Sequence, residues 1–400
     1  MAEKIIVSLI SEQTIPNVQF LKWYIKNNLQ QYDLLFVSTQ KMEQNQKSDY
    51  IKNTLENVSG FQGEIKTIIV DENDIQNIQL NLKSFFEKAK YKEIVANITG
   101  GTKMMSLASF QFFNNLDNSQ IFYQPIGKSL LKLFPETEEF EVDEILTLEE
   151  YLKANGIKYK FDNFCVRDWE FNKTVAEDVI LENRAIISAM VELQNTKAFK
   201  HIFDKKNLNL FELDDSKFVL EKNKNISKNT ICTFLDYAGF DSRNLTKNDL
   251  RYFTGGWFEE FVYQKIMNEL NVKAENVALN IQIEKGKDKN ELDVIYLDSK
   301  NQLHVIECKS FVDGKEGSKV LNDALYKLQA IIKSKFGLNV KSHLYTKSIV
   351  DKESALNRAS DFNRVIVNCC GLKKSVFFIR QPSFVHRPQK LYFWRQVQVV

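Results

Sequence analysis

The first 126 residues alternate short β-rich runs with amphipathic stretches of helical period. The predicted strands are residues 4–10, 33–39, 64–70, 93–99 and 120–126, and the predicted helices are about 16–28, 41–57, 75–89 and 103–115. Neighbouring parallel strands need a crossover connection, which a helix usually supplies. The alternation therefore predicts a Rossmann-like α/β domain with a parallel sheet over residues 1–145.

The rest of the 400-residue chain divides into three segments. Residues 146–250 show helical patterns between Asn- and Lys-rich loops, and predict a helical connector. Residues 251–350 predict a second α/β unit, with a helix at 254–270, strands at 277–284, 291–297 and 303–308, and a helix at 320–336. Residues 351–400 form a basic, aromatic tail, for which we weigh a packed strand with a solvated end against contact with single-stranded nucleic acid.

Charge and cysteine content indicate the cellular compartment of the protein but do not identify its ligand. The formal net charge of +2 gives no global attraction for a polyanion, so a nucleic-acid or nucleotide site must be a local patch. The five cysteines match neither a zinc site nor a disulfide framework, which favours a reduced, cytoplasmic setting. We expect no targeting segment and no membrane span, because no run of about 18 apolar residues is present.

Two predicted strands of the second α/β unit carry acids and a lysine among apolar neighbours. Side chains alternate between the faces of a strand, so Glu291 shares a face with Asp293, and Glu307 shares one with Lys309. Pairing through a turn at 298–302 brings these groups to one end of a sheet. Clustered carboxylates need a cation, and Mg²⁺ and Mn²⁺ prefer oxygen ligands. The alternative is a hairpin edge protected by alternating charges.

Other polar residues near this hairpin have less specific expectations. Gln329 on the following helix is a candidate for orienting the lysine or DNA, with a solvated helix position as the alternative. His304 and Cys308 lie on the strand face opposite Glu307, and are expected to pack rather than to bind a ligand.

A glycine-rich turn ends the strand at 93–99 and opens the next helix. Glycines allow close backbone approach, and the free N–H groups at a helix start attract anions. The loops at 11–17 and 124–128 follow other strands at the same carboxyl edge, where doubly wound sheets bind ligands. The three loops predict a nucleotide-type site, with a purely structural turn as the alternative. The candidates from the turn and the third loop are Thr99, Gly100, Gly101, Thr102, Lys103 and Gly127.

Six stretches resemble, in the same order, the CRISPR-associated Rossmann-fold (CARF) nucleases of type III CRISPR defence. They are SEQTIPNVQF, NITGGTKMMSLA, FYQPIGK, TGGWFEEFVYQKI, KNELDVIYLD and LHVIECKSFVDG. The resemblance covers residues 1–350, and is to cyclic-tetraadenylate-activated DNases with an N-terminal CARF domain and a C-terminal restriction-endonuclease-like domain. Asp293 and the Glu307–Lys309 triplet resemble the PD-(D/E)xK signature, with Leu292 in place of its proline.

The resemblance implies specific residues for both sites. The cyclic-oligoadenylate pocket would be lined by Ser11, Gln13, Thr14, Thr102 and Lys103. The metal-dependent nuclease centre would comprise Asp293, Glu307 and Lys309, with Mn²⁺ or Mg²⁺ on the two acids. Glu259 is preferred over Glu260 as an auxiliary acid, because it shares a helical face with apolar neighbours.

The resemblance also implies partners and a mode of action. It implies a homodimer activated by cyclic tetraadenylate that cuts single-stranded DNA and RNA and nicks duplex DNA. Two alternatives remain open at this point. The chain is instead a nucleotide-responsive regulator that binds nucleic acid without cutting it, or the CARF domain itself cleaves its ring ligand, with Thr102 and Lys103 as the candidate residues.

Overall fold

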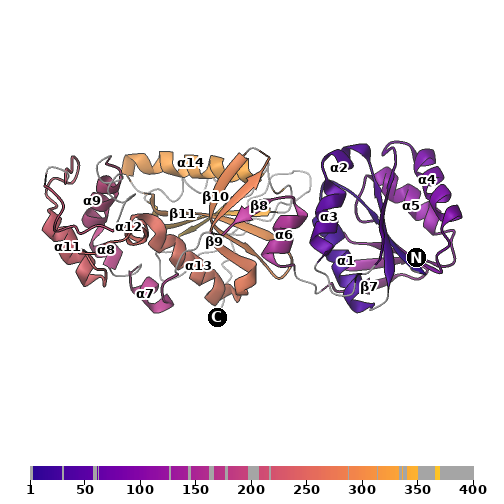
Figure 1. Cartoon of the computed structure of the whole chain (residues 1–400), viewed down its shortest axis with the longest axis horizontal. Coiled ribbons are helices and arrows are strands. Elements are labelled where there is room, and N and C mark those ends of the chain that lie inside the picture. The colour runs from indigo at the N-terminus through magenta and orange to yellow at the C-terminus, as the bar shows by residue number, and fades with distance from the viewer. Residues whose placement is uncertain are drawn as a thin grey trace, which may run out of the picture.

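The computed structural model describes residues 3–349 with gaps, together with residues 365–369. The gaps are 29–30, 57–60, 62, 126–127, 143–145, 162–165, 176–178, 197–206, 216–217, 287, 313, 333–335 and 337–339. Gly127 and most of the tail at 351–400 therefore lie outside the described residues. Figure 1 shows an elongated molecule, with the N-terminal α/β domain at one end, a second sheet in the middle and a group of helices at the other end.

The N-terminal domain is a seven-stranded sheet in the order β3-β2-β1-β4-β5-β6-β7. The five predicted strands are confirmed and parallel: β1 (Lys4–Leu9), β2 (Tyr32–Ser38), β3 (Ile65–Ile69), β4 (Glu93–Asn97) and β5 (Ser119–Tyr123). An antiparallel hairpin that the pattern did not predict, β6 (Leu130–Phe134) and β7 (Glu138–Phe140), extends the sheet.

Helices cover both faces of this sheet. They are α1 (Ile15–Asn27), α2 (Gln40–Gln44), α3 (Lys47–Leu55), α4 (Ile75–Lys88) and α5 (Lys103–Phe113). The single helix predicted at 41–57 is wrong: the chain forms α2 and α3, because Gln46 between them has a left-handed φ of 57°. Phe20 and Ile51 pack in one core, while Ile78 and Met105 pack in another, so α1 and α3 lie opposite α4 and α5.

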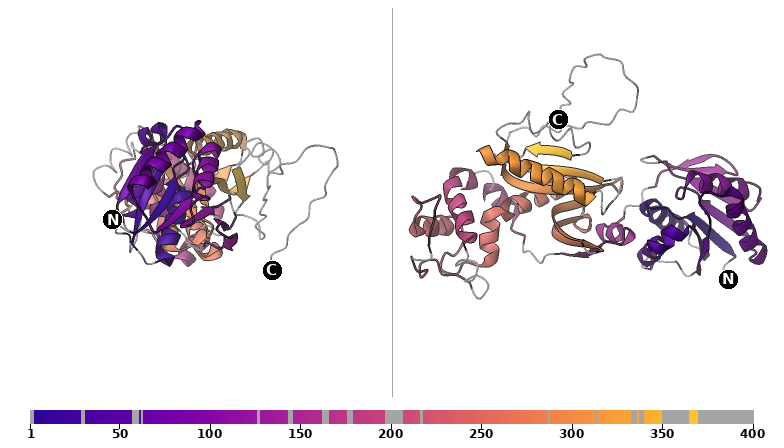
Figure 2. Two further views of the ribbon diagram at one scale, coloured as in Figure 1. Left: turned by 90° about the vertical axis from the view of Figure 1, so that its right-hand side faces the viewer. Right: turned by 90° about the horizontal axis from the view of Figure 1, so that it is seen from above.

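The second sheet has the order β13-β12-β11-β10-β9-β8. Its strands are β8 (Lys158–Lys160), β9 (Val277–Lys285), β10 (Asp288–Leu297), β11 (Leu303–Val312), β12 (Val340–Ile349) and β13 (Val365–Cys369). The pairs β8–β9, β9–β10 and β10–β11 are antiparallel, and the pairs β11–β12 and β12–β13 are parallel. The helices α13 (Trp257–Leu270) and α14 (Gly314–Ile331) pack on opposite faces, and Figure 2 shows α14 lying along the sheet. β13 places one strand of the tail in the sheet. A packed strand was one of the two alternatives expected for that segment.

The segment between the two α/β units is helical, as predicted, but most of it does not lie between them. The helices α7 (Trp169–Thr174), α8 (Ile180–Glu182), α9 (Arg184–Gln194), α11 (Lys228–Tyr237) and α12 (Lys247–Arg251) lie beyond the second sheet, at the end far from the N-terminal domain (Figure 1). Of the elements that the structure describes, α6 (Leu148–Ala154) and β8 stand at the junction.

One apolar core continues through α6 from the first domain into the second sheet. Leu148, Leu152 and Ile157 are each at most 3% exposed, and they belong to the same cluster as Phe20 of α1 and Ile281 of β9. Full burial of a leucine contributes about 1.5–3 kcal/mol. The two α/β units are therefore joined by packing as well as by the chain.

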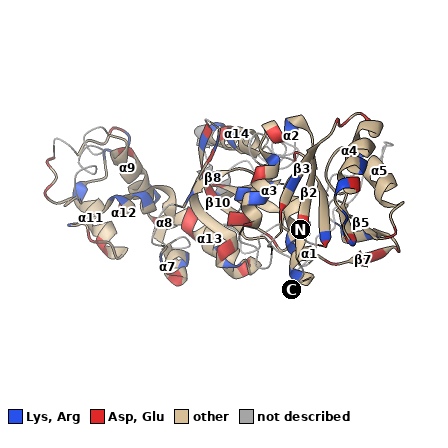
Figure 3. Ribbon diagram, turned by 45° about the vertical axis from the view of Figure 1, so that its right-hand side comes forward, with Lys and Arg blue, Asp and Glu red and all other residues tan. Residues whose placement is uncertain are grey.

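Charges are mixed along the molecule. Figure 3 shows acidic and basic residues interspersed over both α/β units, in keeping with the small net charge. Among the described residues, no helix is both long enough and apolar enough to cross a bilayer.

Candidate active site and ligand edge

The central strands β10 and β11 separate where the predicted acids lie. Their pairing runs from Leu297 opposite Leu303 to Val294 opposite Ile306. At the next position, Asp293 Oδ2 accepts a hydrogen bond from the backbone N–H of Cys308 at 2.7 Å. A carboxylate thus takes the place of a ladder hydrogen bond, and it is held at the point where the two strands diverge.

Glu307 is held by two lysines. Its side chain is 3% exposed, and Lys309 Nζ lies 2.6 Å from Oε1 while Lys327 Nζ lies 2.7 Å from Oε2. The sequence reasoning did not find Lys327, which reaches the site from α14. Gln329, the residue considered on that helix, is exposed. The structure therefore joins Asp293, Glu307 and Lys309, as predicted, and adds a second cation to them.

Burial and like charge strain this cluster electrostatically. Asp293 is 8% exposed, and burial, followed by the charges of Glu307 and Glu259, raises its pKa to about 7. Burial also raises the pKa of Glu259. Although burial alone would lower the pKa of Lys309, the charges of Glu307 and Asp293 raise it above its ordinary value. Perturbed pKa values of this kind are typical of functional sites.

The auxiliary acid comes from the first turn of α13. The side chain of Asn280 hydrogen-bonds the Glu259 carboxylate, whose Oε2 is buried without a partner among the described residues. Glu260 points elsewhere and binds Arg167 at 2.9 Å. The preference for Glu259 agrees with these positions, while the catalytic roles of all these residues stay predictions.

Asn280 marks an irregularity in β9 beside the cluster. Its φ is 52°, and its neighbours Leu279 and Ile281 pack in different cores. The register of β9 with β10 is the same on both sides of Asn280, so no residue is inserted; the left-handed residue alone reverses the alternation of the strand. The sequence carries no signal for this irregularity beyond the tolerance of asparagine for positive φ.

Two other polar residues of the hairpin do not join the cluster. Glu291, expected on the same face as Asp293, is exposed and pairs with Arg251 at 2.9 Å. His304 is buried on the opposite face, as expected, where its Nδ1 lies 2.8 Å from His343 Nε2 and its ring stacks on Tyr296.

The donor set fits a divalent cation in kind. Asp293, Glu307 and the unpartnered oxygen of Glu259 are the hard oxygen ligands that Mg²⁺ and Mn²⁺ prefer. An unpaired buried carboxylate oxygen calls for a positive partner. Within the described ranges, however, no three acidic, histidine or cysteine side chains form a ready-made cage, and lysines contact both oxygens of Glu307.

At the first domain, the loop after β1 is attached to the junction helix. Thr14, 1% exposed, donates its hydroxyl hydrogen bond to the backbone oxygen of Ala154. Ser11 Oγ donates to Gln13 O at 3.0 Å, and both residues are half-buried. Thr14 therefore serves to anchor the loop, while Ser11 and Gln13 remain at its surface.

The glycine-rich turn has clear structural reasons for its residues. A Cβ on Gly100 would lie 2.1 Å from the backbone oxygen of Leu9, and Gly101 has φ of 73°. Thr99 Oγ1 accepts from the backbone N–H of Gln124 at 3.0 Å, which links this turn to the third loop.

The helix that follows this turn presents a lysine at its start. Thr102 caps α5 by accepting from Met105 N at 3.2 Å, and Lys103 is exposed in the first turn. The interpretation as a structural turn accounts for the glycines. Lys103 and the N-terminus of α5 remain available to an anion.

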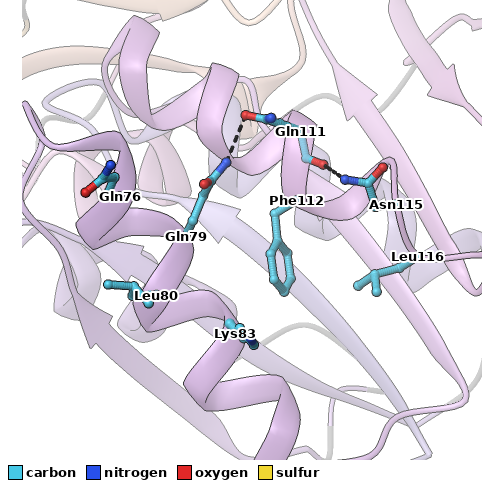
Figure 4. A pocket seen from close by; sticks show the side chains of 8 residues that line it. All are labelled: Gln76, Gln79, Leu80, Lys83, Gln111, Phe112, Asn115 and Leu116. Atoms are coloured by element: carbon cyan, nitrogen blue, oxygen red, sulfur yellow. Dashed lines mark hydrogen bonds between the residues drawn. The ribbon is translucent and has the colours of Figure 1, made fainter.

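A separate pocket of about 510 Å³ lies between α4 and α5 (Figure 4). Gln79 donates to Gln111 at 2.9 Å across it, and Leu80 on its rim is 65% exposed. The predicted ligand residues are not among those that line it.

Three family profiles match the sequence in succession. The Card1 CARF domain matches residues 5–151, the Card1 hinge domain matches residues 162–247, and the Card1-like endonuclease domain matches residues 246–372. No curated protein matches the sequence significantly.

Solved structures share the fold over most of the chain. Protein VC1899 from Vibrio cholerae superposes with a TM-score of 0.69 at 19% identity, covering 91% of this chain and 94% of its own. Can2 from Sulfobacillus thermosulfidooxidans, in complex with cyclic tetra-adenylate, gives 0.64 at 23% identity, covering 91% and 95%. A type III CRISPR defence DNA nuclease activated by cyclic oligoadenylate gives 0.54 at 14% identity, covering 86% of this chain and 45% of its own.

Proposed function

Because the chain belongs to the Card1-type proteins, built of a CARF domain, a hinge domain and an endonuclease domain, we propose that it is a nuclease switched on by a cyclic oligoadenylate. The observation that carries this proposal is the cluster of Asp293, Glu307 and Lys309 at the point where β10 and β11 diverge. A buried carboxylate whose pKa is raised to about 7 is costly to maintain, and a domain that only bound nucleic acid would not need it.

The residues take distinct roles in hydrolysis of a phosphodiester. Asp293 and Glu307, with Glu259 beside them, would hold Mn²⁺ or Mg²⁺, which supplies a polarised phosphoryl oxygen and a more acidic water. Lys309, whose Nζ lies 2.6 Å from Glu307 Oε1, would stabilise negative charge that develops on the phosphoryl group.

The CARF domain supplies the binding edge for the activator. Lys103 and the N–H groups at the start of α5 suit a phosphate, and the loop at 11–17 lies at the same edge of the sheet. Cyclic tetraadenylate has two-fold symmetry, which matches a homodimer that presents the same loops twice. We propose Ser11, Gln13, Thr102 and Lys103 as contact residues, and Thr14 as the residue that ties the loop to the junction.

The junction segment connects this edge to the nuclease strands. Ala154 O accepts from Thr14 at one end of α6, and just before α6 the backbone N–H of Leu146 donates to Asn301 Oδ1 at 2.6 Å. Asn301 lies in the turn of the β10–β11 hairpin, whose far end carries Asp293 and Glu307. A ligand that favours one position of the 11–17 loop will therefore bias the hairpin, provided that it binds the two states unequally.

The test is cleavage of labelled single-stranded DNA, single-stranded RNA and supercoiled duplex DNA with Mn²⁺, with and without cyclic tetraadenylate. We expect cutting that requires both, that stops with a chelator, and that is lost in Glu307→Gln and in Lys103→Ala. The exposed-site variants Glu275→Gln and Lys83→Ala serve as matched controls and should cut normally. If the native chain binds nucleic acid but cuts none of the three substrates with either Mn²⁺ or Mg²⁺, the regulator without cleavage replaces this proposal.

A further inference from the structure

A second lysine at Glu307 has no part in the function proposed so far. We propose that Lys327 is an exchangeable cation of the nuclease centre: it neutralises Glu307 before a divalent cation binds, and moves to a substrate phosphate once the cation has taken its place. This inference rests on the proposed nuclease function. Lys327 would then contact the phosphate beside Lys309, and the centre would use two lysines rather than one.

The geometry separates the two lysines on Glu307. Lys309 Nζ lies 2.6 Å from Oε1, and Lys327 Nζ lies 2.7 Å from Oε2, so each oxygen has its own ammonium group. Lys327 is carried by α14, which packs on the sheet through Leu328 and Ile331, both at most 3% exposed and in the same apolar core as Val305 of β11. The ion pair is not an ordinary surface pair, because its acid is only 3% exposed.

Charge balance gives the reason for an exchange. The three carboxylates Asp293, Glu307 and Glu259 carry three negative charges when ionised, and the two lysines carry two positive charges. A divalent cation added to this set leaves one positive charge in excess beside the buried carboxylates, which attracts a negatively charged group. One phosphodiester group restores neutrality. The site is thus charge-matched to a cation together with a nucleic-acid phosphate, and not to the cation alone.

The structure indicates which lysine moves. Lys309 Nζ also donates to Cys308 O at 3.3 Å, and its side chain is 33% exposed. The side chain of Lys327 is 40% exposed and reaches Glu307 from α14, a different element from the strand that carries the acid. Two features of Lys327 favour its exchange. It is more exposed than Lys309, and it approaches Glu307 from α14 rather than from β11, the strand that carries Glu307. Lys309 therefore stays on Glu307, and Lys327 leaves.

The experiment compares the full-length native chain with Lys327→Met, Lys327→Gln and Lys327→Arg. Lys319→Met, an exposed lysine of the same helix, is the matched control. Mn²⁺ binding is measured by titration calorimetry without nucleic acid or activator. Binding of single-stranded DNA is measured with Ca²⁺ and cyclic tetraadenylate, and single-turnover cleavage with Mn²⁺ and cyclic tetraadenylate. Melting curves verify that each variant is folded, and two neutral substitutions ensure that the result does not depend on one of them.

We expect the neutral variants to bind Mn²⁺ more tightly, by roughly 3- to 10-fold, because a competing charge has left Glu307. Their DNA affinity should fall by about 5-fold or more, because a charge-assisted contact to phosphate is lost. Single-turnover cleavage should fall by about 10-fold or more, with partial recovery in Lys327→Arg. A residue with only a structural role would not tighten Mn²⁺ binding while weakening DNA binding.

Unchanged or weaker Mn²⁺ binding in both neutral variants overturns the inference, as does DNA binding equal to that of the native chain. Failure of the proposed function looks different: the native chain would cut nothing, and the Glu307→Gln variant would bind Mn²⁺ as the native chain does. The two failures are distinguishable, because the calorimetric titration does not depend on cleavage.

Discussion

Replacement of Asp293 by asparagine should make the cation-free protein more stable at high pH. Burial and the neighbouring acids raise the pKa of Asp293 from 3.8 to about 7, so ionisation of the folded protein carries a cost that the unfolded chain does not pay. Asparagine keeps an acceptor for the backbone N–H of Cys308, which now bonds Oδ2, and it cannot ionise. The substitution therefore removes the cost and retains the hydrogen bond.

The size and sign of the effect follow from proton linkage. Below pH 4 both folded and unfolded states keep the proton, so the native aspartate costs nothing there. As pH rises from about 4 to 7 the unfolded chain ionises first, and the stability of the native protein falls. Each unit of pKa is worth about 1.4 kcal/mol, so the gain of Asp293→Asn reaches up to about 4 kcal/mol above pH 7. With added Mn²⁺ the native protein should be more stable than Asp293→Asn, because the ionised aspartate then binds the cation.

Thermal melting at pH 4 and pH 8 in the presence of a chelator measures this, since about 1 kcal/mol shifts the midpoint of a chain of this length by roughly 1 °C. Asp298→Asn is the matched control with the opposite sign. Although burial opposes it, hydrogen bonds from His304 and from the backbone lower the pKa of Asp298, so its charge contributes stability that is lost as pH falls. The reasoning fails if Asp293→Asn gives no gain at pH 8, or an equal gain at pH 4.

Three further changes test other parts of the structure. Arg167→Met should destabilise the protein by about 3–5 kcal/mol, because it leaves the 2%-exposed Glu260 carboxylate without its cation; melting measures this, and a loss below 1 kcal/mol contradicts it. Gly156→Ala should cost more than about 2 kcal/mol, since φ is 67° and the new Cβ would lie 2.2 Å from the ring of Tyr50; an unchanged midpoint refutes the contact. Asn301→Gly keeps the left-handed turn at φ 56° but removes the hydrogen-bond acceptor for Leu146. It should lower activation by cyclic tetraadenylate about 3- to 10-fold with little change in ligand affinity. Activation equal to that of the native chain would exclude coupling through the Leu146–Asn301 hydrogen bond.

The parts of the fold that the sequence predicted are those set by local periodicity. The strand and helix alternation over residues 4–123 is confirmed except for the single helix at 41–57, as are β9 to β11 and the helices α13 and α14 that flank them. The meeting of Asp293 with Glu307 also follows from alternation and one turn. Each of these features depends on residues that are close in sequence, where the period of apolar residues carries the information.

The remaining features depend on contacts between distant segments. β8 has the sequence KYK, with no alternation long enough to read, and forms only because β9 lies beside it more than 110 residues later. Lys327 reaches Glu307 because α14 docks on the sheet at one rotation about its axis, which helical periodicity alone leaves open. The binding of Arg167 to Glu260 likewise joins residues 93 positions apart.

The short strand β8 also limits which fragments of this protein can be expressed separately. It covers the outer edge of β9, yet it belongs to the segment that follows the CARF domain rather than to the endonuclease segment. A fragment that began at the hinge domain would leave the backbone N–H and C=O groups of β9 open to pairing with a second chain, and bare edges of this kind promote aggregation. Residues 148–160 therefore belong structurally to both units, because α6 packs in the apolar core that they share and β8 pairs with β9.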